Sequence, residues 1–170
     1  MITKRWIAVV GGGAAVVLAA STAYAVLVPN AGGSMTRRDI RTETAVNVYT
    51  GPFALLPGAA VSVTVPGGAT RLITASFFAE SGCTGPPGTW CTARILAKET
   101  TSGAVTGFHP TSGVDFSFDS AADDYLESHA MARTARLKTG TYTVYLERAT
   151  TGGGTSFHLD DWTFMVDTNL

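Results

Sequence analysis

The amino-acid sequence predicts an all-β fold, an antiparallel β-sandwich formed by one domain. Apolar and polar side chains alternate through most of the chain after residue 40, and this two-residue period is typical of strands with one buried face. The 19 glycines, several of them beside proline, supply the turns that a succession of strands needs. A length of 170 residues is sufficient for one domain with a buried core and too short for two of ordinary size.

The N-terminus predicts export from the cell. Lys4 and Arg5 precede an apolar run from Trp6 to Ala20, and Ala23-Tyr24-Ala25 then provides the small residues of a signal-peptidase site. We therefore expect residues 1–25 to be a helical signal peptide that is removed by cleavage.

This assignment sets the expected domain organisation. Residues 26–40 have no apolar periodicity and are expected to be a linker, and residues 41–170 are expected to be the β-sandwich domain. The alternative is an uncleaved membrane anchor, because the apolar character continues through Val28. Both alternatives place the domain outside the cell, secreted or at the extracellular face of the envelope, and cleavage would leave no stable membrane insertion.

The net charge argues against two classes of partner. It is −1 for the whole chain, and removal of residues 1–25 leaves 10 basic against 13 acidic residues. Nucleic acids and anionic membranes are bound by clustered lysine and arginine. We expect neither as a partner.

The two cysteines predict a disulfide. Cys83 and Cys91 flank a loop that contains Gly85-Pro86-Pro87-Gly88, which would bend the chain back and bring the thiols together in an oxidising compartment. A metal or redox role would need further ligands or a C-x-x-C spacing, and the sequence has neither.

Five segments before residue 120 have the pattern of strands: 44–49, 61–65, 71–80, 90–98 and 114–119. Residues 71–80 follow a Pro66-Gly67-Gly68 break and carry apolar side chains on both faces, so we expect both faces to be covered. Residues 103–113 are expected to be a loop, and residues 114–119 a strand with one solvated face.

Residues 123–138 fit two structures. Local propensity favours a helix, with Ser120 as its cap, Asp123 and Asp124 in its first turn and Gly140 at its end. A strand would instead place the odd-numbered residues from Glu127 to Leu137 on one face.

Residues 139–167 predict a complete β-hairpin, with Gly152-Gly153-Gly154 as its turn. In its return strand, the apolar residues change from odd positions, as at Leu159, to even positions, as at Trp162. One extra residue in an antiparallel ladder produces such a change of face, so we predict a bulge at Asp160 or Asp161.

Five motifs carry a resemblance to a known family. They are FxAExxC, WCxxRI, SHxMxR, LxxGTYTV and FxLDDWxxxV, which begin at Phe78, Trp90, Ser128, Leu137 and Phe157. Together they resemble a group of uncharacterised small secreted proteins of actinobacteria that have a jelly roll of the C1q and tumour-necrosis-factor type, over about residues 60–167. The resemblance implies a jelly-roll sandwich, a strand around His129 and possible homotrimers, and it implies no activity.

The candidate binding residues are polar or aromatic side chains within otherwise apolar strands: Glu80, His129, Arg133, Asp160, Asp161 and Trp162. One interpretation is structural, with Glu80 paired to Arg133 or Arg94 and His129 held by a carboxylate. The other is a glycan-binding or hydrolytic site, with two carboxylates beside a groove and Trp162 as a platform for a sugar.

Other chemistry has less support from the sequence. There is no G-x-S-x-G motif for a serine hydrolase, and the three histidines lack the spacing of a zinc site, so we assign no catalytic and no metal-binding residue. Calcium is the one cofactor considered, because Asp115, Asp119, Asp123 and Asp124 lie close together in the sequence, although a solvated acidic loop is the explanation that we favour.

We therefore expect a secreted, non-catalytic β-sandwich module that binds a protein, a glycan or a surface, and that could be a homotrimer. The alternative is an extracellular hydrolase that uses Glu80, His129 or the Asp160 and Asp161 pair. A hydrolase needs a concave pocket where two of these groups converge, whereas a structural role would bury and pair them.

Overall fold

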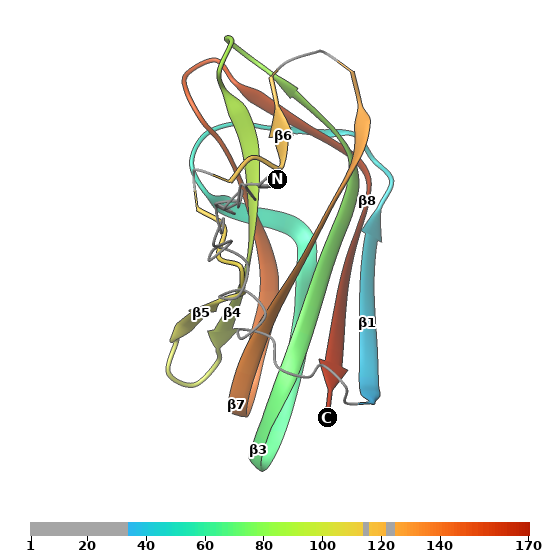
Figure 1. Cartoon of the computed structure of the whole chain (residues 1–170), viewed down its shortest axis with the longest axis vertical. Coiled ribbons are helices and arrows are strands. Elements are labelled where there is room, and N and C mark those ends of the chain that lie inside the picture. The colour runs from blue at the N-terminus through green and yellow to red at the C-terminus, as the bar shows by residue number, and fades with distance from the viewer. Residues whose placement is uncertain (1–33, 114–115, 122–124) are drawn as a thin grey trace, which may run out of the picture. The chain divides into compact units, whose positions relative to one another are not determined.

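The computed structural model describes residues 34–113, 116–121 and 125–170 (Figure 1). The predicted signal peptide at residues 1–25 lies outside the described residues. No helix long and apolar enough to cross a bilayer is found within the described ranges. The described residues belong to one compact unit.

All regular structure in these ranges is β-strand, as the sequence predicts. The strands are β1 (Met35–Glu43), β2 (Asn47–Tyr49), β3 (Ala54–Thr84), β4 (Trp90–Glu99), β5 (Val105–Gly107), β6 (Asp119–Ser120), β7 (Glu127–Thr150) and β8 (Ser156–Asn169). They pair antiparallel in the order β1-β8-β3-β7-β4-β5, with β2 on β8 and β6 on β4.

Strands β3 and β7 form one long ribbon that is folded in half. The first part of β3, up to Val65, pairs with β7 from Gly140 onward, and its second part, from Thr70, pairs with β7 up to Lys138. Figure 1 shows both strands reversing at its lower end. A long hairpin folded on itself in this way gives the two layers of a jelly-roll β-sandwich.

Gly68 and the Thr139 side chain stabilise the bend of the ribbon. Gly68 has φ of +73°, a backbone conformation that residues with a Cβ rarely adopt. The Thr139 hydroxyl lies 3.1 Å from the Pro66 carbonyl and 3.3 Å from that of Ala69, so it can donate to either and link β7 to the bend of β3. Residues of both strands, Gly68 in β3 and Thr139 in β7, therefore hold the bend in place.

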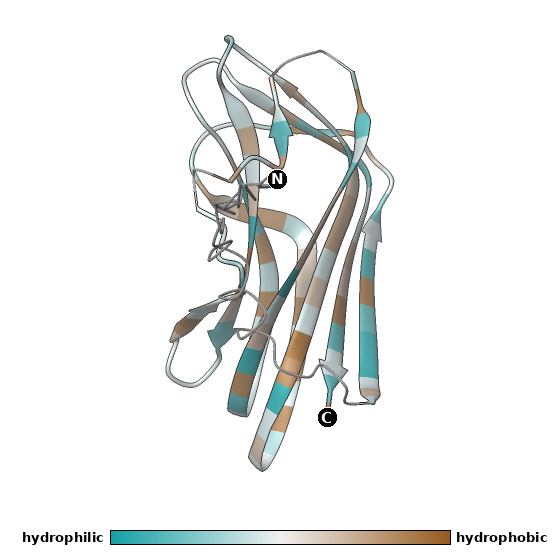
Figure 2. Cartoon of the chain, viewed as in Figure 1, coloured by the Kyte–Doolittle hydropathy of each residue, from teal (hydrophilic) through white to brown (hydrophobic). Residues whose placement is uncertain are grey.

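The core lies between the two layers. Alternate side chains of β3 point inward, and Val61, Val63 and Phe77 are almost fully buried. The layers meet closely at Gly58 of the first part of β3, where an added Cβ would lie 3.5 Å from the indole of Trp162 in β8. Figure 2 shows the hydrophobic and hydrophilic residues alternating along these strands. The period of the sequence thus correctly predicts which side chains form the core.

The predicted hairpin at residues 139–167 is wrong in its pairing, although both of its strands form. β7 pairs with β3 and β4, whereas β8 pairs with β1, β2 and β3. Both edges of the second part of β7 are already occupied, so the chain crosses through Gly152-Gly153-Gly154 to the other layer. Alternation specifies strands and faces, but it does not specify which strands are neighbours.

The predicted bulge is confirmed at Asp161. Phe78 of β3 pairs with Thr163 and Glu80 pairs with Asp160, so Asp161 and Trp162 together oppose Ala79. Asp161 has φ of +42°, and the extra residue keeps both Leu159 and Trp162 buried. The bulge therefore maintains one buried face along the whole strand.

Part of the predicted linker is a strand instead. Met35 to Ile40, within the expected linker at residues 26–40, belong to β1 and pair with the outer edge of β8. Arg38 donates two hydrogen bonds to Asp167, at 2.7 and 2.9 Å. A strand with both faces largely exposed has little apolar alternation, so this one is not visible in the sequence.

Three further expectations have mixed outcomes. The segment around His129 is a strand, as the resemblance implies, and local helix propensity is overruled by the pairing of β7 with β3. Phe116 to Phe118 do not form the predicted strand, and only Asp119 and Ser120 pair there. The predicted strand at residues 44–49 is regular only over Asn47–Tyr49.

The predicted disulfide between Cys83 and Cys91 is confirmed, with the two Cα atoms 5.7 Å apart. It joins the end of β3 to the start of β4 across the intervening loop. Replacing both cysteines by alanine should lower the free energy of unfolding by about 2 to 3 kcal/mol, because the unfolded chain gains the freedom that the small ring denies it. Urea denaturation of the oxidised protein and of the double variant measures the difference, and equal midpoints would contradict it.

The bulge gives a second stability prediction. Asp161→Asn and Asp161→Gly should leave stability almost unchanged, because both residues tolerate a positive φ, whereas Asp161→Val should cost about 1 to 3 kcal/mol. Thr163→Val, in the regular part of the same strand, is the matched control and should cost nothing. Urea denaturation of the four variants tests this, and a stable Asp161→Val protein would show that the bulge is not held by its backbone conformation.

Candidate functional site

A depression lies on the outer face of the layer that contains β8 and the second part of β3. Its volume is about 330 Å³, and it is open to solvent. The residues that line it come from β3, β7 and β8: Phe78, Ala79, Glu80, Ser128, His129, Ala130 and Asp161. Three of the six predicted binding residues, Glu80, His129 and Asp161, are therefore brought together here.

The register of the sheet arranges these side chains in two rows. Phe78 lies beside Ala130 on β7, and Glu80 lies beside Ser128. Residues two apart in a strand share a face, so Phe78 and Glu80 both point outward. Ala130 is small and leaves the aromatic ring uncovered on that side, and Phe78 is 43% exposed.

The bulge adds the third polar group. The backbone N–H of Asp161 donates to the Asp160 carboxylate at 2.9 Å, and the Asp161 side chain is exposed. A regular strand would turn one of these two side chains into the core. Within the described residues, neither Glu80 nor Asp161 has a side-chain ion pair or hydrogen bond, so both carboxylates are available to a ligand.

His129 belongs to a polar cluster behind the depression. The Ser81 hydroxyl donates to Asp119 Oδ2 at 2.7 Å and lies 2.9 Å from His129 Nδ1. A hydroxyl has a single proton, so the bond from His129 must run from Nδ1–H to the Ser81 oxygen. This assigns the proton to Nδ1 and leaves Nε2 4.0 Å from the Glu127 carboxylate.

The cluster contains serine, histidine and aspartate, but it is not arranged as a catalytic triad. In a triad the serine donates to histidine, which is oriented by the aspartate. Here the Ser81 proton goes to Asp119, and the Ser81 side chain is 0% exposed, so no substrate can reach its oxygen. The cluster satisfies buried polar groups. The hydrogen-bond partner of His129 is the Ser81 hydroxyl, and the Asp119 carboxylate, which the structural interpretation would place on the imidazole directly, lies 3.8 Å from Nδ1.

The other predicted residues lie elsewhere. Trp162 is 2% exposed and packs in the core, so it is not a sugar platform. Arg133 donates to Ser112 at 3.2 Å and stacks over Phe116, and partial burial lowers its pKa.

The predicted pairing of Glu80 with Arg133 or Arg94 is wrong. Arg133 bonds to Ser112, and Arg94 pairs with Glu147 at 2.6 Å. Asp160 accepts the bond from the Asp161 N–H and is half-buried.

Phe78 is the residue that sequence reasoning misses. It was expected on a covered face, because residues 71–80 carry apolar side chains on both sides. The signal is in its surroundings: Glu80 shares its face, and its strand neighbours on that face are Ala130 and Thr163. An aromatic residue among small and charged neighbours marks a solvent face rather than a core.

The calcium expectation stays a prediction. Asp115, Asp123 and Asp124 lie outside the described residues, and Asp119 accepts the Ser81 hydroxyl. In the part of the chain that is described, no three His, Cys, Asp or Glu residues are grouped as metal ligands.

Comparisons with known proteins add little. No family model matches the chain, and no curated protein matches it. Among solved structures, the chain is similar to the CBM22-1 xylan-binding domain from Paenibacillus barcinonensis Xyn10C, with a TM-score of 0.37 and 11% identity, over 81% of this chain and 96% of that one. A similarity this low says nothing about what the chain binds.

The arrangement of Ser81, His129 and Asp119 predicts that the Ser81 hydroxyl is chemically unreactive and that its removal destabilises the fold. A fluorophosphonate, which labels activated serines, should give no adduct at Ser81, because the hydroxyl is buried and faces Asp119. Ser81→Ala should lower the free energy of unfolding by about 1 to 3 kcal/mol, because it leaves two polar groups without their partner. Intact-mass spectrometry and urea denaturation measure the two effects. A stoichiometric adduct at Ser81 would contradict this interpretation.

Proposed function

We propose that the chain is a secreted, non-catalytic module that binds a glycan through the depression around Phe78. The observation that supports the proposal is an exposed aromatic ring with unpaired carboxylates on the same face. Buried aromatic rings are ordinary, but a ring on the solvent face of a sheet, beside groups that can accept hydrogen bonds, is typical of a binding surface.

The chemistry of the depression suits a sugar. The C–H face of a pyranose is apolar and can stack on the Phe78 ring, while its hydroxyls can donate to Glu80 and Asp161 and exchange hydrogen bonds with Ser128. These side chains stand on paired strands, so little conformational entropy is lost when a ligand binds. The ligand would lie across β7, β3 and β8, because each of the three contributes to the lining.

The geometry gives the hydrolase alternative less support. Glu80 and Asp160 lie opposite each other on neighbouring strands, so both carboxylates approach a ligand from the same surface. Glycoside hydrolysis needs two carboxyl groups on either side of the scissile bond, in a site that excludes bulk water. The depression is open, and Ser81 of the serine–histidine–aspartate cluster is inaccessible to a substrate.

Secretion and assembly are part of the proposal. The signal-peptide pattern at residues 1–25 supports export, and both cysteines are joined in a disulfide, as is usual in oxidising compartments. The homotrimer stays a prediction that rests on the C1q-like resemblance.

Glycan binding should depend on the Phe78 ring. Phe78→Ala should weaken binding at least about 10-fold, because it removes the stacking surface, whereas Phe78→Trp should retain it. Leu55→Ala is the matched control, since Leu55, at 49% exposure, is a similarly exposed apolar residue on the other layer. A glycan array identifies the ligand, and calorimetry with the best oligosaccharide compares the variants. Equal affinity of the wild-type and Phe78→Ala proteins would refute the site.

The carboxylates of Glu80 and Asp161 should strengthen glycan binding, because a charged carboxylate accepts stronger hydrogen bonds than a neutral amide does. Glu80→Gln and Asp161→Asn should each weaken binding about 3- to 30-fold, since hydrogen bonds to charged groups are the stronger ones. Asparagine also tolerates the φ of +42° at position 161, so the bulge is preserved. Loss of glycan hydrolysis in these variants, if the wild type hydrolysed a glycan at all, would instead establish the enzyme.

A further inference from the structure

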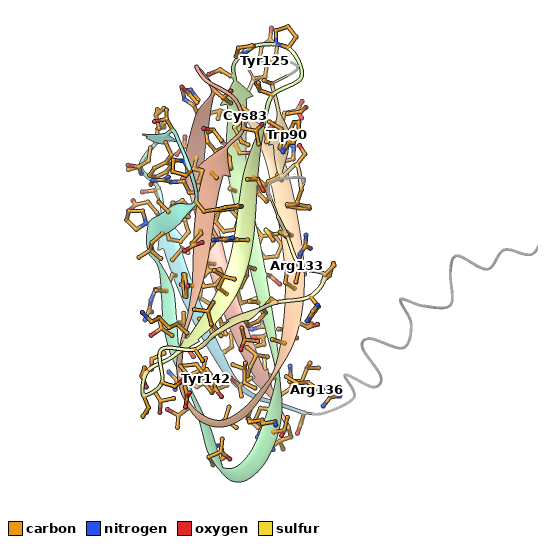
Figure 3. All side chains as sticks on the ribbon, turned by 90° about the vertical axis from the view of Figure 1, so that its left-hand side faces the viewer. Cys83, Trp90, Tyr125, Arg133, Arg136 and Tyr142 are labelled. Atoms are coloured by element: carbon orange, nitrogen blue, oxygen red, sulfur yellow. A yellow bond between two sulfur atoms is a disulfide. The ribbon has the colours of Figure 1, made fainter. Side chains whose placement is uncertain are left out.

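We infer that the chain has a second ligand site, at the disulfide-bonded end of the domain, that takes an uncharged sugar ring. A cavity of about 490 Å³ lies there, as open to solvent as the Phe78 depression, and its volume is within the usual range for small-ligand sites. Its lining comes from two segments: Pro87, Gly88, Thr89 and Trp90 on one side, and Ser117, Ser120 and Ala121 on the other. Figure 3 shows Trp90 close to Cys83 at this end.

The first wall is a rigid turn. Pro87 and Gly88 are its central residues, and Gly88 has φ of +82°, which is the requirement of a type II turn. The Thr89 N–H donates to the Pro86 carbonyl at 3.2 Å, and its hydroxyl donates to the same oxygen at 2.8 Å. The Cys83–Cys91 disulfide closes the loop, so the turn is held at its base as well.

Trp90 is positioned by its backbone. Its N–H donates to the Thr151 hydroxyl at 2.9 Å, and its carbonyl accepts from the Thr151 N–H, also at 2.9 Å. It pairs with Ser120 of β6. The half-buried indole is therefore presented to the cavity from a fixed point.

The second wall is fastened to the first. The Ala121 N–H donates to the Thr89 carbonyl at 3.1 Å, and the Phe118 N–H donates to that of Cys91 at 2.9 Å. The side chains of Ser117 and Ser120 are exposed. Both walls thus exist before any ligand arrives, which reduces the entropic cost of binding.

The lining selects the class of ligand. The described residues that line it have no ionisable side chain, whereas those that line the Phe78 depression include two carboxylates. An indole and a proline ring offer apolar surface. The Ser120 hydroxyl can donate and accept, whereas the Thr89 and Ser117 hydroxyls, which donate to the Pro86 and Asp119 carbonyls, can accept. A neutral sugar ring has both complements, and a charged ligand would leave its charge unpaired. The site does not depend on the Phe78 depression, since the two share no lining residue.

The test uses the oxidised protein, the Phe78→Ala variant and a panel of cellohexaose, mannohexaose and chitohexaose, with oligogalacturonate as the charged comparison. In ¹⁵N-labelled Phe78→Ala protein, at least one neutral probe should shift the Trp90 indole N–H and the Ser117 and Ser120 amides, and oligogalacturonate should not. Because the first site is disabled, failure of the proposed function leaves this result unaffected.

Two variants disrupt the site by different means. Ser120→Arg fills it from an exposed position, and Trp90→Ala removes its aromatic wall; each should raise the Kd of the active probe at least about 10-fold. Ser62→Arg, at an exposed serine of β3 whose row crosses β4 at Lys98, eight residues from Trp90, should leave the Kd unchanged. The inference is overturned if no neutral probe shifts these resonances, if oligogalacturonate shifts them equally, or if only a proline-rich peptide does so, which would make this a peptide site.

Discussion

The folded β3–β7 ribbon is the constraint on which the rest of the structure depends. The two strands remain hydrogen-bonded over both layers, and they change layer together at the bend near Gly68, where Thr139 links them. Once this ribbon is folded, its inner faces must enclose the core, and β8 and β4 can only join at the edges that remain. The other pairings of the domain follow from this arrangement.

Because the inner faces are filled, function is left to the outer faces and the ends. The Phe78 depression uses an outer face, where β3 and β7 present alternate residues and the β8 bulge adds Asp161. The second cavity uses an end, where the disulfide and β6 hold two loops together. In both cases backbone hydrogen bonds, within the sheet at the first site and between loops at the second, fix the positions of side chains that face solvent.

The sequence predicted local structure better than it predicted neighbours. Strand positions, inward faces, the bulge and the disulfide follow from side-chain period and spacing, which are local properties. The partner of β8 and the existence of β1 do not, because pairing depends on which edges are free after the ribbon folds.

The candidate site shows the same contrast between local properties, which the sequence predicts, and surroundings, which it does not. Glu80, His129 and Asp161 were recognised as polar residues in apolar strands, but Trp162 and Phe78 were assigned to the wrong environments. The alternation of apolar and polar residues separates the two faces of a strand but does not reveal which face meets solvent. For an aromatic side chain, this decides whether it packs in the core or can contact a ligand.

The two outermost strands have a consequence for a molecule that meets many copies of itself. An unprotected sheet edge can pair with that of another molecule and so begin an aggregate. β5, at one end of the strand order, is only three residues long. β1, at the other, carries Arg37, Arg38 and Arg41. Arg37 and Arg38 are paired with Asp39 and Asp167, so this edge presents bulky charged side chains, which are unfavourable to bury against another strand. The margins of this sheet are thus built to keep the molecule from polymerising through its own backbone.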